Sequence, residues 1–406
     1  MPSINDYEQF TGRSVIEELK ILSERLHGKR VANVNSTATG GGVAEILHRM
    51  IPLLRELGVD VEWQVIKGGE RFFAVTKKIH NALHGRQEVI SSDDYDHYLD
   101  VNRRNIDELK LDADILFIHD PQPAALVESR KQVGGKWIWR CHVDFSMPRP
   151  DVWSFLRQYI EQYDASVFSA PSFARDLSIR QVLISPSIDP LSDKNRELPS
   201  EQVRDILERF GIDPERPILT QISRFDYLKD PVGVVDMYRL VKKYSDVQLV
   251  LAGGGATDDP EGMKVLAEVR ERAGDDPDIH ILFLPPASDI EINALQRGST
   301  VILQKSLREG FGLTVAEALW KAKPVVASAV GGIPLQIAHK YSGLLSRTIE
   351  GTAFYVRQLL HAPEYARKLG ENGREHIRSN FLITRHLRDY LLLFLSLYHP
   401  EEIVYL

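Results

Sequence analysis

Two carboxylates bracket a glycine-rich turn in the second half of the chain. Glu309 and Glu317 are the first and last residues of the run EGFGLTVAE, which covers residues 309–317. Glycines let backbone N–H groups approach a ligand closely, and the start of a helix favours a negatively charged group. The carboxylates can accept hydrogen bonds from hydroxyl groups. The run therefore predicts a site that holds a nucleotide sugar.

Each carboxylate also has a simpler interpretation. Thr314 and Glu317 fit the capping-box pattern, in which both side chains bond to the backbone at the start of a helix. Glu309 taken alone could be an ordinary carboxylate on a loop. The pair is harder to explain in this way, because the two glycines, a helix and the strand at residues 324–327 all follow in the expected order.

A second candidate is the cationic pair Arg224 and Lys229. The pair follows a predicted strand at residues 218–222 and precedes a predicted helix, so it lies at the carboxyl edge of a parallel sheet. Arginine offers a fork of donors and lysine a compact charge, and both can converge on one dianion. The alternative is a solvated loop that carries two common charges.

Two glycine runs follow strands, at residues 40–42 and 253–255. Neither is a G-x-G-x-x-G fingerprint, because Glu45 and Asp258 stand where the third glycine is required, and this argues against a dinucleotide-dependent oxidoreductase. We expect the backbone at Gly41 and Gly42 to approach a bound donor. A tight strand-to-helix turn is the alternative at both runs.

Polar side chains end two neighbouring strands in the first half. Asp120 and Gln122 follow the strand at residues 115–118, and His142 and Asp144 follow the strand at residues 137–139. Histidine, carboxylate and amide groups are good hydrogen-bond partners for sugar hydroxyls. A single histidine at the end of a strand is more often structural. Several such polar groups at the ends of two neighbouring strands favour a functional role.

The elements that position these residues alternate along the chain. Strands are predicted at 30–35, 59–66, 115–118, 137–139, 167–169 and 182–184, and again at 218–222, 248–251, 279–282, 300–303 and 324–327. Helical patterns separate them, which is typical of parallel sheets in α/β domains. Prolines at 186, 190 and 199 mark a linker. We therefore predict an acceptor-side domain at 1–190, joined by a C-terminal helix at about 382–406, and a nucleotide-sugar-binding domain at 191–381.

Composition narrows the class of protein. The chain has 406 residues, 43% of them apolar, which favours two globular domains. A net charge of −7 argues against nucleic-acid binding, and no apolar stretch is long enough to predict a membrane span. Cys141 is the only cysteine, so an intrachain disulfide and a cysteine zinc site are excluded, and we expect a buried thiol in a cytoplasmic protein.

Taken together, these segments resemble glycosyltransferase family 4, a family of retaining enzymes with the GT-B fold. The match lies in Arg224, Lys229, Glu309 and Glu317. The runs HDPQP at 119–123 and WRCHVD at 139–144 are similar to the trehalose-forming branch, which includes synthases and phosphorylases. The resemblance implies two doubly wound parallel-sheet domains that face each other across a cleft.

The resemblance also implies roles. Arg224 and Lys229 would hold the diphosphate of a nucleoside-diphosphate glucose, and Glu317 its ribose. Glu309 and His142 would lie at the transferred sugar. The remaining expected contacts to the donor are Gly41, Gly42, Gly310, Phe311, Gly312, Leu313 and Thr314, and those to the acceptor are Asp120, Gln122 and Asp144. No metal or other cofactor is expected, because cationic side chains and a helix end would replace a metal at the leaving group.

The predicted activity is a retaining glucosyl transfer to free glucose that makes trehalose. A trehalose phosphorylase of the same fold, a non-catalytic nucleotide-sugar-binding module and a sugar epimerase stay open as alternatives. The sequence fixes neither the nucleobase of the donor nor the direction of the reaction, and it leaves a homodimer open.

Overall fold

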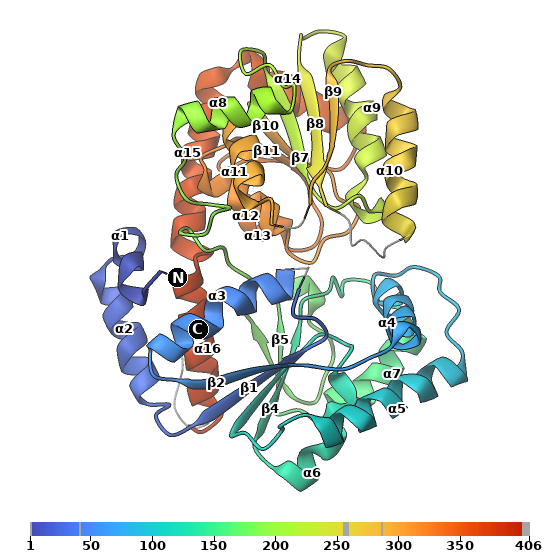
Figure 1. Ribbon diagram of the computed structural model, residues 1–406, viewed down its shortest axis with the longest axis vertical. Coiled ribbons are helices and arrows are strands. Elements are labelled where there is room, and N and C mark those ends of the chain that lie inside the picture. The colour runs from blue at the N-terminus through green and yellow to red at the C-terminus, as the bar shows by residue number, and fades with distance from the viewer. Residues whose placement is uncertain (1, 40–41, 255–259, 286, 400–406) are drawn as a thin grey trace. The chain divides into compact units, whose positions relative to one another are not determined.

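A computed structural model describes residues 2–39, 42–254, 260–285 and 287–399 (Figure 1). The chain divides into two compact units. Unit 1 comprises Met1–Ser187 together with Ile383–Leu406, and unit 2 comprises Ile188–Leu382. The chain therefore passes from one unit to the other twice, at residues 187–188 and at residues 382–383.

Unit 1 is built on a six-stranded parallel sheet with the order β2-β1-β3-β4-β5-β6. Its strands are β1 (Arg30–Asn35), β2 (Asp60–Val65), β3 (Ile115–His119), β4 (Lys136–Cys141), β5 (Ala165–Phe168) and β6 (Arg180–Leu183). Its α-helices are α1 (Glu8–Thr11), α2 (Arg13–Glu24), α3 (Gly42–Glu56), α4 (Glu70–Leu83), α5 (Ser92–Glu108), α6 (Arg130–Val133), α7 (Pro150–Ile160) and α16 (Ile383–Ser396). All six strands predicted for this half of the chain are confirmed.

The last helix of unit 1 belongs to its core although it is distant in sequence. Helix α16 packs against α2 and α3 (Figure 1). Its Tyr390 and Phe394 rings lie edge-on to Phe117 of β3, with ring centres 4.8 and 5.6 Å apart. Arg388 pairs with Glu18 of α2 at 2.8 Å. The apolar period that predicts a helix at the C-terminal end of the sequence thus reflects burial inside unit 1.

Unit 2 repeats the arrangement with the strand order β12-β11-β10-β7-β8-β9, again all parallel. Its strands are β7 (Ile218–Ile222), β8 (Gln248–Gly253), β9 (Ile279–Phe283), β10 (Val301–Gln304), β11 (Val325–Ser328) and β12 (Leu344–Ser346). Its α-helices are α8 (Ser200–Arg209), α9 (Pro231–Lys242), α10 (Pro260–Ala273), α11 (Asp289–Gly298), α12 (Leu313–Trp320), α13 (Ile333–Gln336), α14 (Ile349–His361) and α15 (Pro363–Asn380).

Helices cover both faces of this second sheet because its strands are apolar on both sides. Leu219 of β7 lies in a core with side chains of α9, α10 and α14. Its neighbours Ile218 and Ile222 lie in a second core with side chains of α8 and α11. Side chains alternate across a strand, so one five-residue strand serves both layers.

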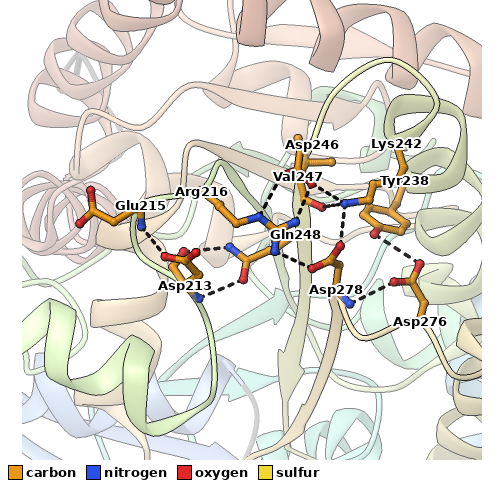
Figure 2. Close-up of polar contacts among 10 residues, drawn as sticks. All are labelled: Asp213, Glu215, Arg216, Tyr238, Lys242, Asp246, Val247, Gln248, Asp276 and Asp278. Carbon is orange, nitrogen blue, oxygen red and sulfur yellow. Dashed lines mark hydrogen bonds and ion pairs between the residues drawn. The ribbon is translucent and has the colours of Figure 1, made fainter.

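Ion pairs link the amino ends of three strands of unit 2 (Figure 2). Arg216, just before β7, pairs at 2.6 Å with both Asp246, before β8, and Asp278, before β9. Lys242 reaches the same two carboxylates at 2.7 and 2.6 Å. Hydrogen bonds from Arg216 and then Lys242 hold the pKa of Asp278 well below its usual range. The opposite, carboxyl ends of the strands carry the loops described below.

The structure corrects some local predictions. The run SVIE at residues 14–17 fits the capping-box pattern and predicts Ser14 as the N-cap of a helix. That prediction is wrong, because helix α2 begins at Arg13 with Gly12 as its N-cap residue. Helix α12 likewise begins at Leu313 behind Gly312, so the capping box of Thr314 and Glu317 is wrong. Strand β12 was not predicted from the sequence, because three residues carry too little pattern.

Candidate functional site

In unit 2 the loops that follow β7 and β10 lie against each other, because these strands are neighbours in the sheet. Gln221 joins the loops from both sides: its carbonyl oxygen Oε1 accepts the backbone N–H of Lys305 at 2.8 Å, and its Nε2 donates to the carbonyl of Lys229 at 2.9 Å. The backbone N–H of Leu307 donates to the carbonyl of Leu228 at 2.8 Å. The two motifs predicted separately from the sequence therefore form one loop cluster.

Lys229 and Glu309 form the ion pair at the centre of this cluster. Lys229 Nζ lies 2.6 Å from Glu309 Oε2, and the two side chains are 17% and 10% exposed. The same oxygen accepts from Ser306 Oγ at 3.1 Å and from Gln304 Nε2 at 3.5 Å. A strongly hydrogen-bonded carboxylate thus fixes the position of the ammonium group, which still has further N–H donors to offer.

Glycines bring a second turn close behind this carboxylate. Gly312 is the residue before α12 and has a φ of +86°. Residues other than glycine rarely adopt this left-handed backbone conformation. Gly331, at φ +55°, lies so close to the Glu309 carbonyl that a β-carbon would come within 1.6 Å of the oxygen. Gln336 Nε2 donates to the carbonyl of Phe311 at 2.6 Å. The EGFG turn is therefore held from behind, and Gly310, Leu313 and Thr314 are half-buried around it.

Arg224 takes a different position on the same loop. Its side chain is 54% exposed, and its Nη2 lies 3.3 Å from Asp226 Oδ2. Asp226 is itself fixed, since its Oδ1 accepts the backbone N–H of Leu228 at 2.8 Å. Ser223 packs on Gly253 of β8, where a β-carbon would come within 1.9 Å of the Ser223 carbonyl oxygen. The structure thus presents Arg224 to solvent from a loop with a fixed base.

Glu317 lies one turn further along α12 and is buried among cations. Its Oε1 is 3.9 Å from Lys194 Nζ. Lys321 Nζ donates to the Glu317 carbonyl at 3.1 Å, to Asn195 Oδ1 at 3.0 Å and to Gln296 Oε1 at 2.8 Å. Burial lowers the pKa of Lys321 to about 7, although the Glu317 carboxylate acts in the opposite direction. Glu317 does not contact the Lys229–Glu309 pair through any bond found among the described residues.

In unit 1 the polar groups after β3 and β4 also meet. Asp120 Oδ1 accepts the backbone N–H of His142 at 2.7 Å, and Asp120 adopts a positive φ of 68°. His119 Nδ1 lies 3.2 Å from His142 Nε2, with the two rings inclined at 20°. His119 Nε2 lies 3.0 Å from Asn33 Oδ1 of β1. The grouping predicted from two strand ends is confirmed for Asp120 and His142, and it extends to a third strand.

Burial and a buried guanidinium set the charges in this group. Arg140 is fully buried on β4. Burial, reinforced by Arg140, lowers the pKa of His119 to about 3 and holds the pKa of His142 well below its usual range. Burial raises the pKa of Asp120 to about 6, although the His142 N–H and Arg140 both oppose the shift. Both imidazoles are therefore neutral at pH 7.

The other predicted residues of unit 1 are placed less directly. Asp144 is 1% exposed, and its Oδ1 accepts the backbone N–H of Ser146 at 2.9 Å. Gln122 is half-buried, and its backbone carbonyl accepts from Asn102 at 3.1 Å. Gly42 is the exposed first residue of α3, and Gly41 lies outside the described residues. Asp144 thus shapes its own turn, whereas Gln122 and His142 are the more accessible groups.

Sequence reasoning missed several members of both groups. In unit 2 these are Ser306 and Gln304 beside Glu309, and Lys194 and Lys321 beside Glu317; in unit 1 the missed member is Asn33. Two of these residues could have been found from the sequence. Lys321 follows Glu317 by one helical turn, and Asn33 is a polar residue inside the apolar strand VANV. Lys194 left no signal in the sequence, because its contact depends on the tertiary fold. Cys141 is buried, as predicted.

The described part of the chain lacks two features. None of its helices is long and apolar enough to span a membrane. Within the same residues, no three His, Cys, Asp or Glu side chains are grouped as ligands for a metal ion.

Comparison with known proteins agrees with this geometry. Residues 33–175 match the family described as trehalose synthase, N-terminal domain, and residues 202–376 match the glycosyl transferases group 1. A trehalose synthase from Thermococcus litoralis is 46% identical over 96% of this chain and 95% of its own. A trehalose phosphorylase from Pleurotus pulmonarius is 29% identical over 92% of this chain and 58% of its own.

The fold is shared more widely. The solved structure of an α,α-trehalose-phosphate synthase (UDP-forming) from Burkholderia vietnamiensis has a TM-score of 0.74 at 18% identity, covering 92% of this chain and 99% of that one. The two six-stranded parallel sheets are the GT-B architecture expected from the sequence. The chain is therefore a hexosyltransferase that acts in trehalose-related glycosyl transfer, and it belongs to the trehalose synthase family of group 1 glycosyltransferases.

Proposed function

We propose that the protein transfers glucose from a nucleoside-diphosphate glucose to free glucose, with retention of configuration, to form trehalose. The observation that carries this proposal is the loop cluster of unit 2. There Lys229 pairs with Glu309, and the Glu309 side chain packs against Gly312 at the start of α12. An ammonium group and a helix N-terminus are suited to a diphosphate, and the hydroxyl-accepting carboxylate next to them is suited to a sugar.

The mechanism we propose relies on charge. Breaking the anomeric bond leaves positive charge on the sugar and negative charge on the departing diphosphate. Lys229 and the exposed Arg224 would stabilise the diphosphate, as groups fixed before the reaction do most effectively. Glu309 would bind the donor hexose and Glu317 the ribose. Because these cations suffice for the leaving group, we propose that no metal or other cofactor is needed, which an assay in the presence of a chelator tests.

For the two sugars, we propose that Gln122 contacts hydroxyls of the acceptor and that His142 contacts a hydroxyl of the transferred glucose. Asp120 would act mainly by holding the backbone of His142, and Asp144 by holding the turn at Ser146. We propose free glucose as the acceptor. The carboxylates of Asp120 and Asp144 disfavour a phosphorylated acceptor, and Arg140 offsets part of the charge of Asp120.

A trehalose phosphorylase is the second candidate, and the Pleurotus relative favours it. In that reaction inorganic phosphate would take the place of the diphosphate beside Lys229. Two assays separate the candidates. A synthase forms trehalose and free nucleoside diphosphate from nucleoside-diphosphate glucose and glucose, and it releases no glucose 1-phosphate from trehalose and phosphate. The opposite result in both assays makes the protein a phosphorylase, and a strong preference for glucose 6-phosphate refutes the acceptor.

A further inference from the structure

Three side chains of unit 1 form a hydrogen-bonded line across three strands. Asn33 lies on β1, His119 ends β3 and His142 follows β4. The register places Asn33 beside Phe117 and His119 beside Arg140. Alternate residues of a strand share a face, so Asn33, His119 and His142 all point to one side of the sheet. The contacts are 3.0 Å from Asn33 Oδ1 to His119 Nε2 and 3.2 Å from His119 Nδ1 to His142 Nε2.

The chemistry of the first contact determines where the protons lie. With the Asn33 amide oriented as in the structure, its oxygen faces His119 and can only accept, which assigns the proton to Nε2 of His119. A neutral imidazole carries one proton, and Nδ1 of His119 is therefore an acceptor. It follows that Nε2 of His142 is the donor in the second contact. In neutral His142, the other nitrogen, Nδ1, then holds a free lone pair.

The surroundings keep both rings neutral. Arg140 and His386 are the basic groups that face them, and both disfavour a further positive charge. Asp120 is the nearby acid, and its Oδ1 bonds to the backbone of His142 rather than to a ring. Within the described residues, His142 Nδ1 makes no hydrogen bond, and the side chain is half-buried rather than closed off.

We propose that Asn33 is a positioning residue that sets the tautomer of His142 through His119, so that His142 Nδ1 accepts a hydrogen bond from a sugar hydroxyl. The inference rests on the proposed function for the contact between His142 and the sugar. The opposite tautomer would present an N–H group at the same place and would have no acceptor for that hydroxyl.

Two substitutions of Asn33 separate its roles. Asn33→Leu removes the acceptor at similar size, so His119 and then His142 become mixtures of tautomers. Asn33→Asp keeps the acceptor and adds a charge that favours protonated His119. Protonated His119 donates from Nδ1 and forces His142 into the opposite tautomer. Asn33→Asp is therefore expected to behave like wild type at high pH and to change tautomer as the pH falls.

The tautomers are read by long-range ¹H–¹⁵N NMR on the full chain labelled at histidine, without substrate. His119→Gln and His142→Gln variants assign the two signals among the 13 histidines. We expect His142 protonated on Nε2 in the wild type. The matched control is Asn35→Leu, which removes another buried amide of β1 that bonds to Thr37 and Trp63 and not to a histidine; it should leave the tautomer unchanged.

Trehalose formation supplies the second measurement. With thermal melting used to establish folding, kcat/KM should fall in Asn33→Leu at every pH in proportion to the His142 population that leaves the acceptor tautomer, about twofold for an equal mixture. In Asn33→Asp it should fall only at low pH. A wild-type His142 protonated on Nδ1, an unchanged tautomer in Asn33→Leu, or an altered tautomer with unchanged kcat/KM would each overturn the proposal. Failure of the proposed function is distinct, because the wild-type chain would then form no trehalose at all.

Discussion

Replacing Lys229 by methionine should separate catalysis from stability in the loop cluster. Removing one partner of a fully buried ion pair costs about 3–5 kcal/mol of unfolding free energy, and an exposed pair contributes about 0–1 kcal/mol. The Lys229–Glu309 pair lies nearer the buried limit, with side chains 17% and 10% exposed. In the variant, Glu309 keeps its hydrogen bonds from Ser306 and Gln304, and these lower the cost of leaving its charge without Lys229. We therefore expect Lys229→Met to destabilise unit 2 by about 2 kcal/mol.

The effect on turnover should be larger and should not follow stability. Loss of one fixed charge that stabilises the leaving group lowers kcat by about 10²–10³-fold. The double variant Lys229→Met, Glu309→Gln leaves no unpaired charge, so it should regain most of the lost stability. It should not regain turnover, because the cation is still missing.

Denaturant unfolding and steady-state trehalose formation measure the two effects. Lys242→Met is the matched control, because Lys242 forms two ion pairs at the opposite ends of the strands (Figure 2). It should lose stability while keeping kcat near wild type. Near-normal turnover in Lys229→Met, or recovery of turnover in the double variant, would refute the reasoning and leave Lys229 as a counter-ion of Glu309.

Three further outcomes are expected. Arg224→Ala should change the unfolding free energy by less than about 1 kcal/mol, because the side chain is 54% exposed, yet lower kcat by about 10²-fold; unaltered kinetics would remove Arg224 from the site. Glu317→Gln should weaken nucleoside diphosphate binding by roughly 1.5–3 kcal/mol in calorimetry, and an unchanged affinity with only a lower melting temperature would make Glu317 structural. Stability should fall as the pH drops from about 6.5 toward 3, because the unfolded chain binds a proton at His119 that the folded chain, with a pKa of about 3, refuses. Asp120, with a pKa raised to about 6, opposes this trend between pH 6 and 4. A His119→Gln variant isolates the contribution of the histidine, and a pH dependence of melting that matches wild type would refute the prediction.

The sequence predicted the sheets well because each strand is apolar and each intervening helix is periodic. It failed where a local pattern competed with tertiary contacts. The hydroxyl of Thr314 donates to Gln304 at 2.9 Å instead of capping α12. Glycines at 12 and 312 took the N-cap positions that the capping-box pattern assigned to Ser14 and Thr314.

The candidate site was also predicted only in part, because its residues were found from the sequence and their contacts were not. Arg224, Lys229 and Glu309 were found from their types and spacing, but the ion pair between the last two depends on β7 and β10 being neighbours in the sheet. The line from Asn33 to His142 depends on register across three strands, which no spacing along the chain encodes. Sequence thus predicted the members of the site, and the fold determined which of them meet.

The double passage of the chain between its units has a consequence for synthesis on the ribosome. Unit 2 is one continuous segment, Ile188–Leu382, whereas unit 1 needs α16, which is made after all of unit 2. Until then, Phe117 lacks Tyr390 and Phe394, and Glu18 lacks Arg388. The half that emerges first is therefore the half that finishes folding last. Until α16 has been made, the apolar surface that it covers in unit 1 stays exposed to solvent, and such surface favours aggregation of the growing chain.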